Sequence, residues 1–294
     1  MIFKDYLVLG ASGFLGSQLA KSLTGSALLH VNRANDLLKG SDFVQFKLDD
    51  DEFYPLDELF GKYRFKTVIN CIANTDIEDC EKNQEKAFAL NGHLPKKLAR
   101  FSESYDFRLI HISTDAVFDG KIPFRSELDI PIPSTVYGRS KLKGEQEVLE
   151  HSHNSLVARV NFVGHSNRKM TLFDYFYRNL TDKQGVTGYT NIYFTPLLVN
   201  QTASAILALD KLSLSGVYHV AGRERLSKFD FAKLVCEIWD LDASYLSGAP
   251  YTSSISRALD LSLDTSKITD LGIVFPNIVD SLQAYRQAIR GELE

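Results

Sequence analysis

The chain has 294 residues, a formal net charge of −4 and a sequence pI near 6.0. This mild acidity, without a basic run, argues against nucleic acid or a membrane surface as a partner, and no run of about 18 apolar residues predicts a membrane span. A hydrophobic content of 44% can fill the core of one large domain, or of a main domain with a smaller lobe.

Short apolar runs alternate with helical patterns through the first half of the chain. The predicted order is strand 6–9, a helix through Leu15, Leu19 and Leu23, strand 27–31, strand 43–48, helix 56–60, strand 67–73, a helical region over 81–105, strand 108–113, helix 142–150 and strand 156–160. Strands separated by helices predict a doubly wound parallel sheet of the α/β class.

The alternation breaks after residue 164, where a polar stretch rich in Tyr, Phe and Asn begins. Beyond it we expect a helix over 199–210, a strand over 217–220, a helix over 227–239 opened by a capping Ser227, and a helix over 279–290. We therefore predict a main domain over 1–164, with segments near 193–220 returning to it. Most of 165–294 is predicted to form a smaller α/β lobe that binds substrate.

The cysteines show no metal-ligand spacing. Cys71, Cys80 and Cys236 are odd in number and two of them lie in apolar segments, which predicts reduced thiols in a cytoplasmic protein with no metal site. The first residues are interrupted by glycine too early for a signal peptide.

Gly10, Gly13 and Gly16 stand between the first predicted strand and the first predicted helix. Gly10 permits a tight turn, Gly13 lets the backbone approach a pyrophosphate, and Gly16 lets the helix pack closely on the strand. Backbone N–H groups at the start of the helix then face the anion. This arrangement predicts a Rossmann dinucleotide-binding domain, although a tight turn without a ligand remains the alternative.

The residues after the second strand indicate which dinucleotide binds. An NAD site usually has an acidic side chain here, whereas this chain has Asn32 and Arg33. Arginine can pair with a 2′-phosphate through charge-assisted hydrogen bonds, which favours NADPH. Arg33 as a solvated loop charge is the alternative, and the nearby Asp36 leaves NADH open.

Tyr137 and Lys141 have the spacing that places two side chains on one face of a helix. A neighbouring ammonium is expected to lower the pKa of the phenol, and such a tyrosine can exchange a proton with a carbonyl or alcohol oxygen. The pair alone is weak evidence. The strand ending at Ser113 and Thr114 strengthens it, because ligands of open α/β sheets bind at the carboxyl ends of the strands.

Five segments together resemble the extended short-chain dehydrogenases/reductases. They are the glycine turn 10–16, Asn-Cys-Ile-Ala at 70–73, Asn91, Ser-Thr-Asp-Ala-Val-Phe-Asp-Gly at 113–120 and Tyr-Gly-Arg-Ser-Lys at 137–141. The last two segments are more narrowly similar to dTDP-4-dehydrorhamnose reductases. Two later segments share this similarity: Val-Tyr-His-Val-Ala-Gly at 217–222 and Leu-Asp-Thr-Ser-Lys at 263–267. The resemblance covers nearly the whole chain.

The resemblance implies roles for the matching positions. Thr114, Tyr137 and Lys141 would be the catalytic residues, with Lys141 also holding the nicotinamide ribose. Cofactor contacts are implied for Gly10, Ser12, Gly13, Phe14, Leu15, Gly16, Asn32, Arg33, Asp49 near the adenine, Cys71, Ile72, Ala73, Asn91 as a support of the active-site helix, Ser113, Tyr137, Lys141 and Phe162. Substrate contacts are implied for Thr114, Asp115, Val117, Phe118, Phe162 and, from the aromatic segment 189–196, Tyr193. Phe162 stands where the rhamnose enzymes have a tryptophan.

The resemblance implies an NADPH-dependent reductase, with NADH possible, acting on the 4-keto group of a nucleotide-linked 6-deoxy sugar in polysaccharide precursor synthesis. Two alternatives remain open. Some relatives are non-catalytic NADP-binding regulatory subunits, and others are nucleotide-sugar epimerases. Dehydration is disfavoured because Asp115 is followed by Ala116 rather than a second acid. A monomer and a homodimer are both compatible with the sequence.

Overall fold

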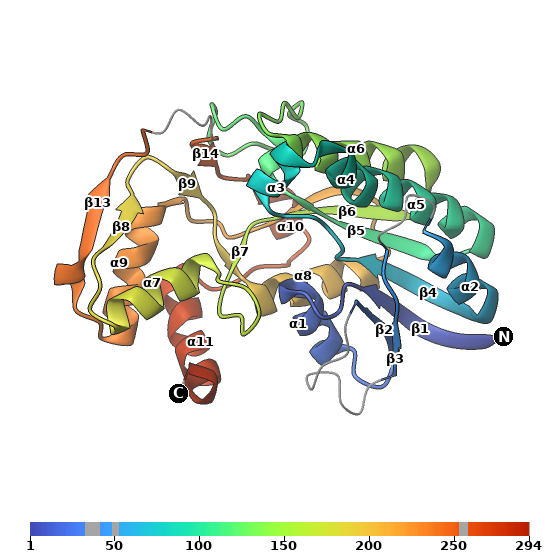
Figure 1. Ribbon diagram of the computed structural model, residues 1–294, viewed down its shortest axis with the longest axis horizontal. Helices are drawn as coiled ribbons and strands as arrows, with labels where there is room; N and C mark the ends of the chain where they lie inside the picture. Colours follow the sequence, from blue (N-terminus) through green and yellow to red (C-terminus); the bar gives the residue numbers. More distant parts are fainter. Residues whose placement is uncertain (33–41, 49–52, 253–257, 294) are drawn as a thin grey trace.

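A parallel β-sheet is the centre of the computed structural model, which describes residues 1–32, 42–48, 53–252 and 258–293 (Figure 1). Within these residues the sheet has seven strands. In spatial order they are β11 (Gly216–Val220), β6 (Ser155–Val160), β5 (Arg108–Thr114), β4 (Tyr63–Asn70), β1 (Ile2–Leu9), β2 (Ala27–Val31) and β3 (Phe43–Gln45). The order runs outward from β1 in both directions, so the fold is doubly wound, and the predicted fold class is confirmed.

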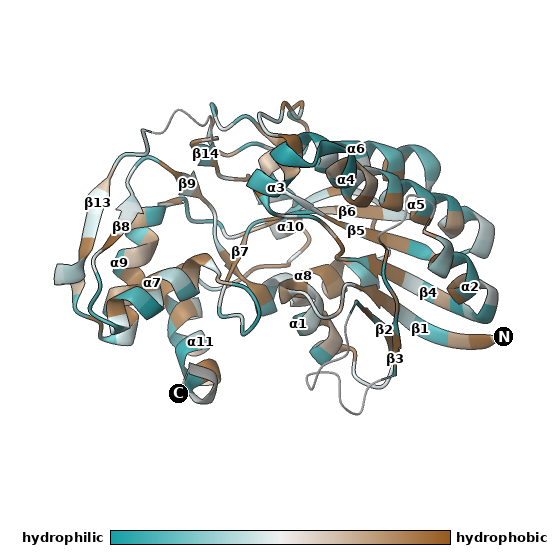
Figure 2. Ribbon diagram, viewed as in Figure 1, coloured by the Kyte–Doolittle hydropathy of each residue, from teal (hydrophilic) through white to brown (hydrophobic). Residues whose placement is uncertain are grey.

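Helices cover both faces of the sheet, and each face has its own apolar core. One core lies under α1 (Phe14–Ser22), α8 (Val199–Lys211) and α10 (Ser266–Thr269). The other lies under α2 (Tyr54–Lys62), α5 (Leu94–Tyr105) and α6 (Val136–His151). β2, β5 and β6 are buried at every residue, which explains their nearly continuous apolar runs. Figure 2 shows hydrophobic residues along the strands of the sheet.

A third apolar core belongs to the C-terminal part of the chain. It is formed by α7 (Leu172–Thr181), β8 (Val186–Tyr189), α9 (Lys228–Trp239) and α11 (Ile278–Leu293), with β13 (Leu246–Ala249) paired to β8. β11 and α8 instead join the main sheet and its flank.

Short elements connect the parts of the fold. They are α3 (Ile77–Lys82), α4 (Gln84–Phe88), the π-helix η2 (Ala89–His93), the 3₁₀ helices η3 (Asp115–Val117) and η4 (Ala243–Tyr245), and the strands β7 (Phe162–Val163), β9 (Tyr193–Phe194), β10 (Leu197–Leu198), β12 (Leu226–Ser227) and β14 (Asp260–Leu261).

The predicted and the observed elements differ in several places. The third strand is shorter than 43–48, and the helix expected over 142–150 begins at Val136. The polar stretch after residue 164 contains α7, which the sequence pattern does not predict. Its start is marked by a capping box, in which the Thr171 hydroxyl accepts from the Asp174 backbone and the Asp174 carboxylate accepts from the Thr171 backbone. Ser227 caps α9 in the same way, as predicted.

Candidate active site

A cavity of about 620 Å³ opens at the carboxyl ends of β1, β4 and β5. Thirteen sequence-predicted site residues line it: Ser12, Gly13, Phe14, Leu15, Gly16, Cys71, Ala73, Ser113, Thr114, Asp115, Tyr137, Lys141 and Phe162. The fold therefore brings the glycine turn, the end of β5 and the start of α6 together around one space. This is the edge where ligands of open α/β sheets bind.

The glycine turn has the geometry that its sequence predicts. Gly10 has a φ of 75°, a conformation that other residues rarely adopt, and the Gly13 N–H donates to its carbonyl oxygen at 2.9 Å. Gly13 is the N-cap of α1 and supplies no side-chain hydrogen bond to the helix. The first N–H groups of α1 thus meet the cavity without a side-chain cap, as an anion-binding helix terminus requires.

Gly16→Ala is expected to destabilise the fold and to weaken dinucleotide binding. A Cβ at Gly16 would lie 2.2 Å from the Gly10 carbonyl oxygen, so the turn must move away from α1. Overpacking of this kind costs about 1–3 kcal/mol. Denaturant unfolding and NADPH titration would measure both effects.

Gly61→Ala in α2 is the matched control for this variant, because nothing lies within 4 Å of the position that the alanine Cβ would take. It should keep or slightly raise the stability of the protein, since alanine is the better helix former. Equal stability and equal NADPH affinity in the two variants would contradict the role assigned to Gly16.

Tyr137 enters the cavity from the first turn of α6. The Thr135 side chain caps this helix by accepting from the Gly138 N–H at 3.1 Å, which fixes the backbone at Tyr137. Burial raises the pKa of Tyr137 well above its usual range, and a hydrogen bond with Thr114 only partly opposes the shift. The expected lowering of this pKa by Lys141 is therefore wrong for this structure. The phenol is protonated at neutral pH and can donate a proton.

Lys141 lies one helical turn further, with its side chain buried. Its Nζ donates to the Ile112 carbonyl oxygen at 2.6 Å and lies 3.4 Å from His111 Nε2. Burial lowers the pKa of Lys141 to about 8, although Glu145 and Cys71 favour the charged form. The ammonium is directed at the end of β5 rather than at the phenol, which explains why it does not acidify Tyr137.

Thr114, Asp115 and Asn161 form a hydrogen-bonded group beside Tyr137. The Thr114 hydroxyl donates to Asp115 Oδ1 at 2.9 Å, and the Asn161 amide donates to Asp115 Oδ2. Burial raises the pKa of Asp115 to about 6, while the Thr114 hydrogen bond and the charge of Lys228 favour the carboxylate. The carboxylate thus orients the Thr114 hydroxyl at the cavity wall. Asn161 and Lys228 also line the cavity. The resemblance places Asn161 in the segment 159–164 beside the nicotinamide, but neither residue is among the site residues expected from the sequence.

Asn91 supports the active-site helix from outside the cavity. Its amide donates to Ser140 Oγ and to the Asn74 carbonyl, both at 2.9 Å, and its Oδ1 accepts from the Asn74 N–H at 2.8 Å. These bonds tie α6 to the segment that follows β4.

A buried ion pair lies behind the end of β5. Arg159 on β6 donates to Glu145 on α6 at 2.8 Å, and both side chains are at most 4% exposed. The Ser113 hydroxyl also donates to Glu145. The ion pair therefore joins β6 to the helix that carries Tyr137, and the Ser113 hydrogen bond joins the strand that carries Thr114 to the same helix.

The remaining predicted residues lie outside the lining of the cavity. Val117 and Phe118 are buried in the core, and the Arg159 guanidinium lies 5.1 Å from the Phe118 ring. Tyr193 stacks on Arg225, whose guanidinium is 3.5 Å from the ring centroid. Gly10 lies against Ile72, which leaves little room for a side chain at this position of the turn, and Asn32 is exposed. Arg33 and Asp49 lie outside the described residues.

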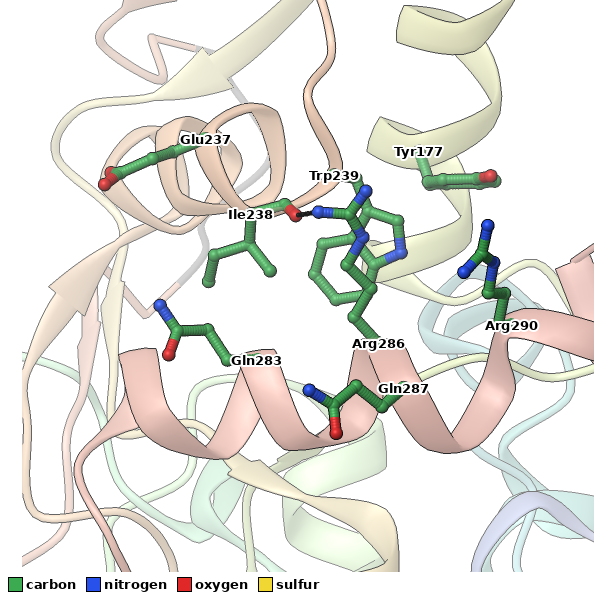
Figure 3. A pocket seen from close by; sticks show the side chains of 8 residues that line it. All are labelled: Tyr177, Glu237, Ile238, Trp239, Gln283, Arg286, Gln287 and Arg290. Atoms are coloured by element: carbon green, nitrogen blue, oxygen red, sulfur yellow. Dashed lines mark hydrogen bonds between the residues drawn. The ribbon is translucent and has the colours of Figure 1, made fainter.

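Another cavity, of about 680 Å³, lies between α7, α9 and α11 (Figure 3). It shares no lining residue with the cavity at the sheet edge. Arg286 in this cavity donates hydrogen bonds to the Ile238 carbonyl and to Asp240, so its guanidinium caps the C-terminus of α9. We place the chemistry at the sheet edge, where the glycine turn and Tyr137 meet.

A family model described as the RmlD substrate binding domain matches residues 4–290. The chain belongs to this family. The predicted resemblance to dTDP-4-dehydrorhamnose reductases and related extended short-chain dehydrogenases/reductases is thereby confirmed.

Relatives and solved structures of this family span nearly the whole chain. The probable low-salt glycan biosynthesis reductase Agl14 of Haloferax volcanii is 32% identical and covers 96% of this chain and 97% of its own length. Methionine adenosyltransferase 2 subunit beta of Danio rerio is 28% identical over 92% of this chain and 86% of its own length. The crystal structure of a hypothetical dTDP-4-dehydrorhamnose reductase from Sulfolobus tokodaii is 31% identical, covers 91% of this chain and 94% of its own, and has a TM-score of 0.81.

More distant structures show the fold alone. They are 18–23% identical, with TM-scores of 0.71–0.84, and several hold NADP or NAD. Among the described residues, no helix is long and apolar enough to cross a membrane.

Proposed function

We propose that this protein is an NADPH-dependent reductase of the 4-keto group of a nucleotide-linked 6-deoxy sugar. The observation that supports it most is the meeting of Thr114, Tyr137 and Lys141 with the glycine turn around one cavity. The family and the reductase names of its relatives favour the same activity.

The residues present fit a bound dinucleotide. The uncapped start of α1 can hold the diphosphate, and the absence of a side chain at Gly16 lets the Gly10 backbone approach this helix start closely. Phe162 packs edge-on against Phe14 with ring centroids 5.5 Å apart, so two aromatic side chains line the cavity beside the turn. The bound cofactor supplies the hydride.

The protein then handles the proton and the position of the carbonyl. Tyr137 holds the proton that passes to the sugar oxygen as negative charge develops there. The Thr114 hydroxyl, which donates to Asp115 in this structure, would turn its one proton to the same oxygen. Lys141 places a positive charge at the end of β5, where it stabilises the developing anion.

A screen of nucleotide-linked 4-keto sugars with NADPH and NADH tests the proposal. We expect substrate-dependent loss of the absorbance of reduced nicotinamide, larger with NADPH. A relative named as a methionine adenosyltransferase subunit makes a regulatory subunit the second candidate. Tight NADPH binding without turnover of any 4-keto sugar would favour that candidate, and interconversion of sugars without net oxidation of NADPH would favour an epimerase.

The pH dependence of kcat/KM for NADPH should form a plateau between about 6 and 8. This parameter reports the free enzyme. Asp115 is ionised above its pKa of about 6, so it can accept from Thr114. Lys141 is charged below its pKa of about 8 and loses its proton above it. Asp115→Asn should remove the acidic limb alone, and a flat profile through both values would contradict these assignments.

The names of two relatives favour a role for the proposed reaction in polysaccharide synthesis. Agl14 is named for glycan biosynthesis, and a Bacillus subtilis relative is named a spore coat polysaccharide biosynthesis protein. We infer that this chain supplies reduced nucleotide sugar for polysaccharide synthesis in the cytoplasm. Cys71, Cys80 and Cys236 are free thiols, which agrees with a reducing compartment.

A further inference from the structure

Residues 165–171, here called the strap, connect β7 to α7 along the mouth of the active-site cavity. Figure 1 shows this segment next to α1, and Ser166, Arg168, Lys169 and Met170 line the cavity. No sequence motif of a cofactor site falls within the strap, which lies in the polar stretch after residue 164.

Two cations of the strap reach across the cavity. Arg168 Nη1 donates to the Ser12 carbonyl oxygen at 2.6 Å, within the glycine turn. Lys169 Nζ donates to Thr75 Oγ1 at 3.1 Å, in the segment after β4. The strap therefore bridges the two segments between which the diphosphate of a dinucleotide would lie.

Within the described part of the chain, the two cations of the strap make no ion pair with an acidic side chain. Among the residues that the structure describes, no carboxylate lies within ion-pair distance of Arg168 or Lys169. Arg168 instead bonds a neutral carbonyl beside the uncapped start of α1. Two unneutralised cations and a helix N-terminus at one place favour an anionic ligand.

The ends of the strap are fixed while its centre is exposed. His165 Nδ1 and Asp174 Oδ1 are 2.6 Å apart, and Thr171 Oγ1 donates to the Gly164 carbonyl at 2.7 Å. His165 and Thr171, at the two ends of the strap, are at least partly buried, whereas Arg168 is exposed. The strap is thus held beside the glycine turn, and the Arg168 side chain can change its partner there.

We propose that Arg168 binds the diphosphate of the dinucleotide, with Lys169 as a second and weaker positive charge. This inference rests on the proposed function, because it requires a dinucleotide at the glycine turn. Arg168 exchanges the Ser12 carbonyl for phosphate oxygens, since hydrogen bonds from a guanidinium to a phosphate are stronger than those to a neutral acceptor. The strap then closes the cavity over the cofactor.

Fluorescence titration with NADPH, NADH, ADP-ribose and dTDP tests the proposal without turnover. Arg168→Ala is expected to raise the Kd of NADPH, NADH and ADP-ribose about tenfold, since each contains the same diphosphate. Arg168→Lys should lie between this variant and the wild type, because it keeps the charge and loses the planar fork. Arg178→Ala, an exposed arginine of α7 outside the cavity, is the control and should bind as the wild type does.

Each alternative outcome is distinguishable. An unchanged Kd in Arg168→Ala, with an unchanged melting temperature, overturns the inference and leaves the proposed function intact. If Arg168→Ala weakens the binding of NADPH but not of NADH, Arg168 binds the 2′-phosphate. If it weakens the binding of dTDP alone, Arg168 binds the substrate diphosphate. Either result overturns the inference. A wild type that binds neither NADPH nor NADH overturns the proposed function itself.

Discussion

Tyr137→Phe is expected to lower kcat by about 10²–10⁴-fold, the usual contribution of a positioned proton donor. Burial keeps the pKa of Tyr137 high, so the phenol carries its proton at neutral pH. Phenylalanine keeps the ring and the packing but cannot donate. The loss should therefore appear in kcat for the sugar, while the Kd of NADPH stays at the wild-type value.

The control for this variant is Tyr175→Phe, an exposed tyrosine of α7 outside the cavity lining. Steady-state kinetics and NADPH titration of both variants give the comparison. Near-wild-type kcat in Tyr137→Phe would contradict the role of Tyr137 as proton donor. An equal loss in Tyr175→Phe would show that the effect is not local to the site.

Arg159→Met is expected to lower the free energy of unfolding by about 3–5 kcal/mol, because it leaves the Glu145 carboxylate buried without its partner. Arg159 and Glu145 are both buried, and the pair makes three hydrogen bonds, from Nε to each carboxylate oxygen and from Nη2. Methionine keeps the apolar length of the side chain. Denaturant unfolding at neutral pH measures the loss.

Two further variants give this prediction its controls. Lys66→Met breaks an exposed pair with Asp5, in which the lysine side chain is 82% exposed, and should cost no more than about 1 kcal/mol. Arg159→Met combined with Glu145→Leu removes both charges and should regain much of the lost stability. Equal effects of Arg159→Met and Lys66→Met, or no recovery in the double variant, would refute the account of a buried charge pair.

Local sequence patterns were sufficient to predict much of the fold. The glycine turn, the Ser227 cap and the spacing of Tyr137 and Lys141 involve residues within one or two helical turns, so their geometry follows from the neighbouring backbone. The doubly wound parallel sheet was accessible because parallel strands joined by helices have few arrangements. α7 was missed although Phe173, Phe176 and Leu180 recur at helical spacing and the capping pair Thr171 and Asp174 marks its start.

The chemical state of the site could not be derived in the same way. The expected effect of Lys141 on the pKa of Tyr137 assumed that helical neighbours interact, whereas the lysine turns to the Ile112 carbonyl and burial dominates the phenol. Desolvation depends on every element around a group, so the spacing of two residues cannot reveal it.

By itself the sequence determined the fold class, the glycine turn and the candidate residues of the proposed catalytic step, since these depend on short spacings and on the order of strands and helices. Only the tertiary structure decided which distant residues join them. Arg168 meets Ser12 across 156 positions, Asn161 meets Asp115 across 46, and Arg159 meets Glu145 from a different element. Such contacts arise when β-strands and helices pack around a shared core, and no local pattern records them.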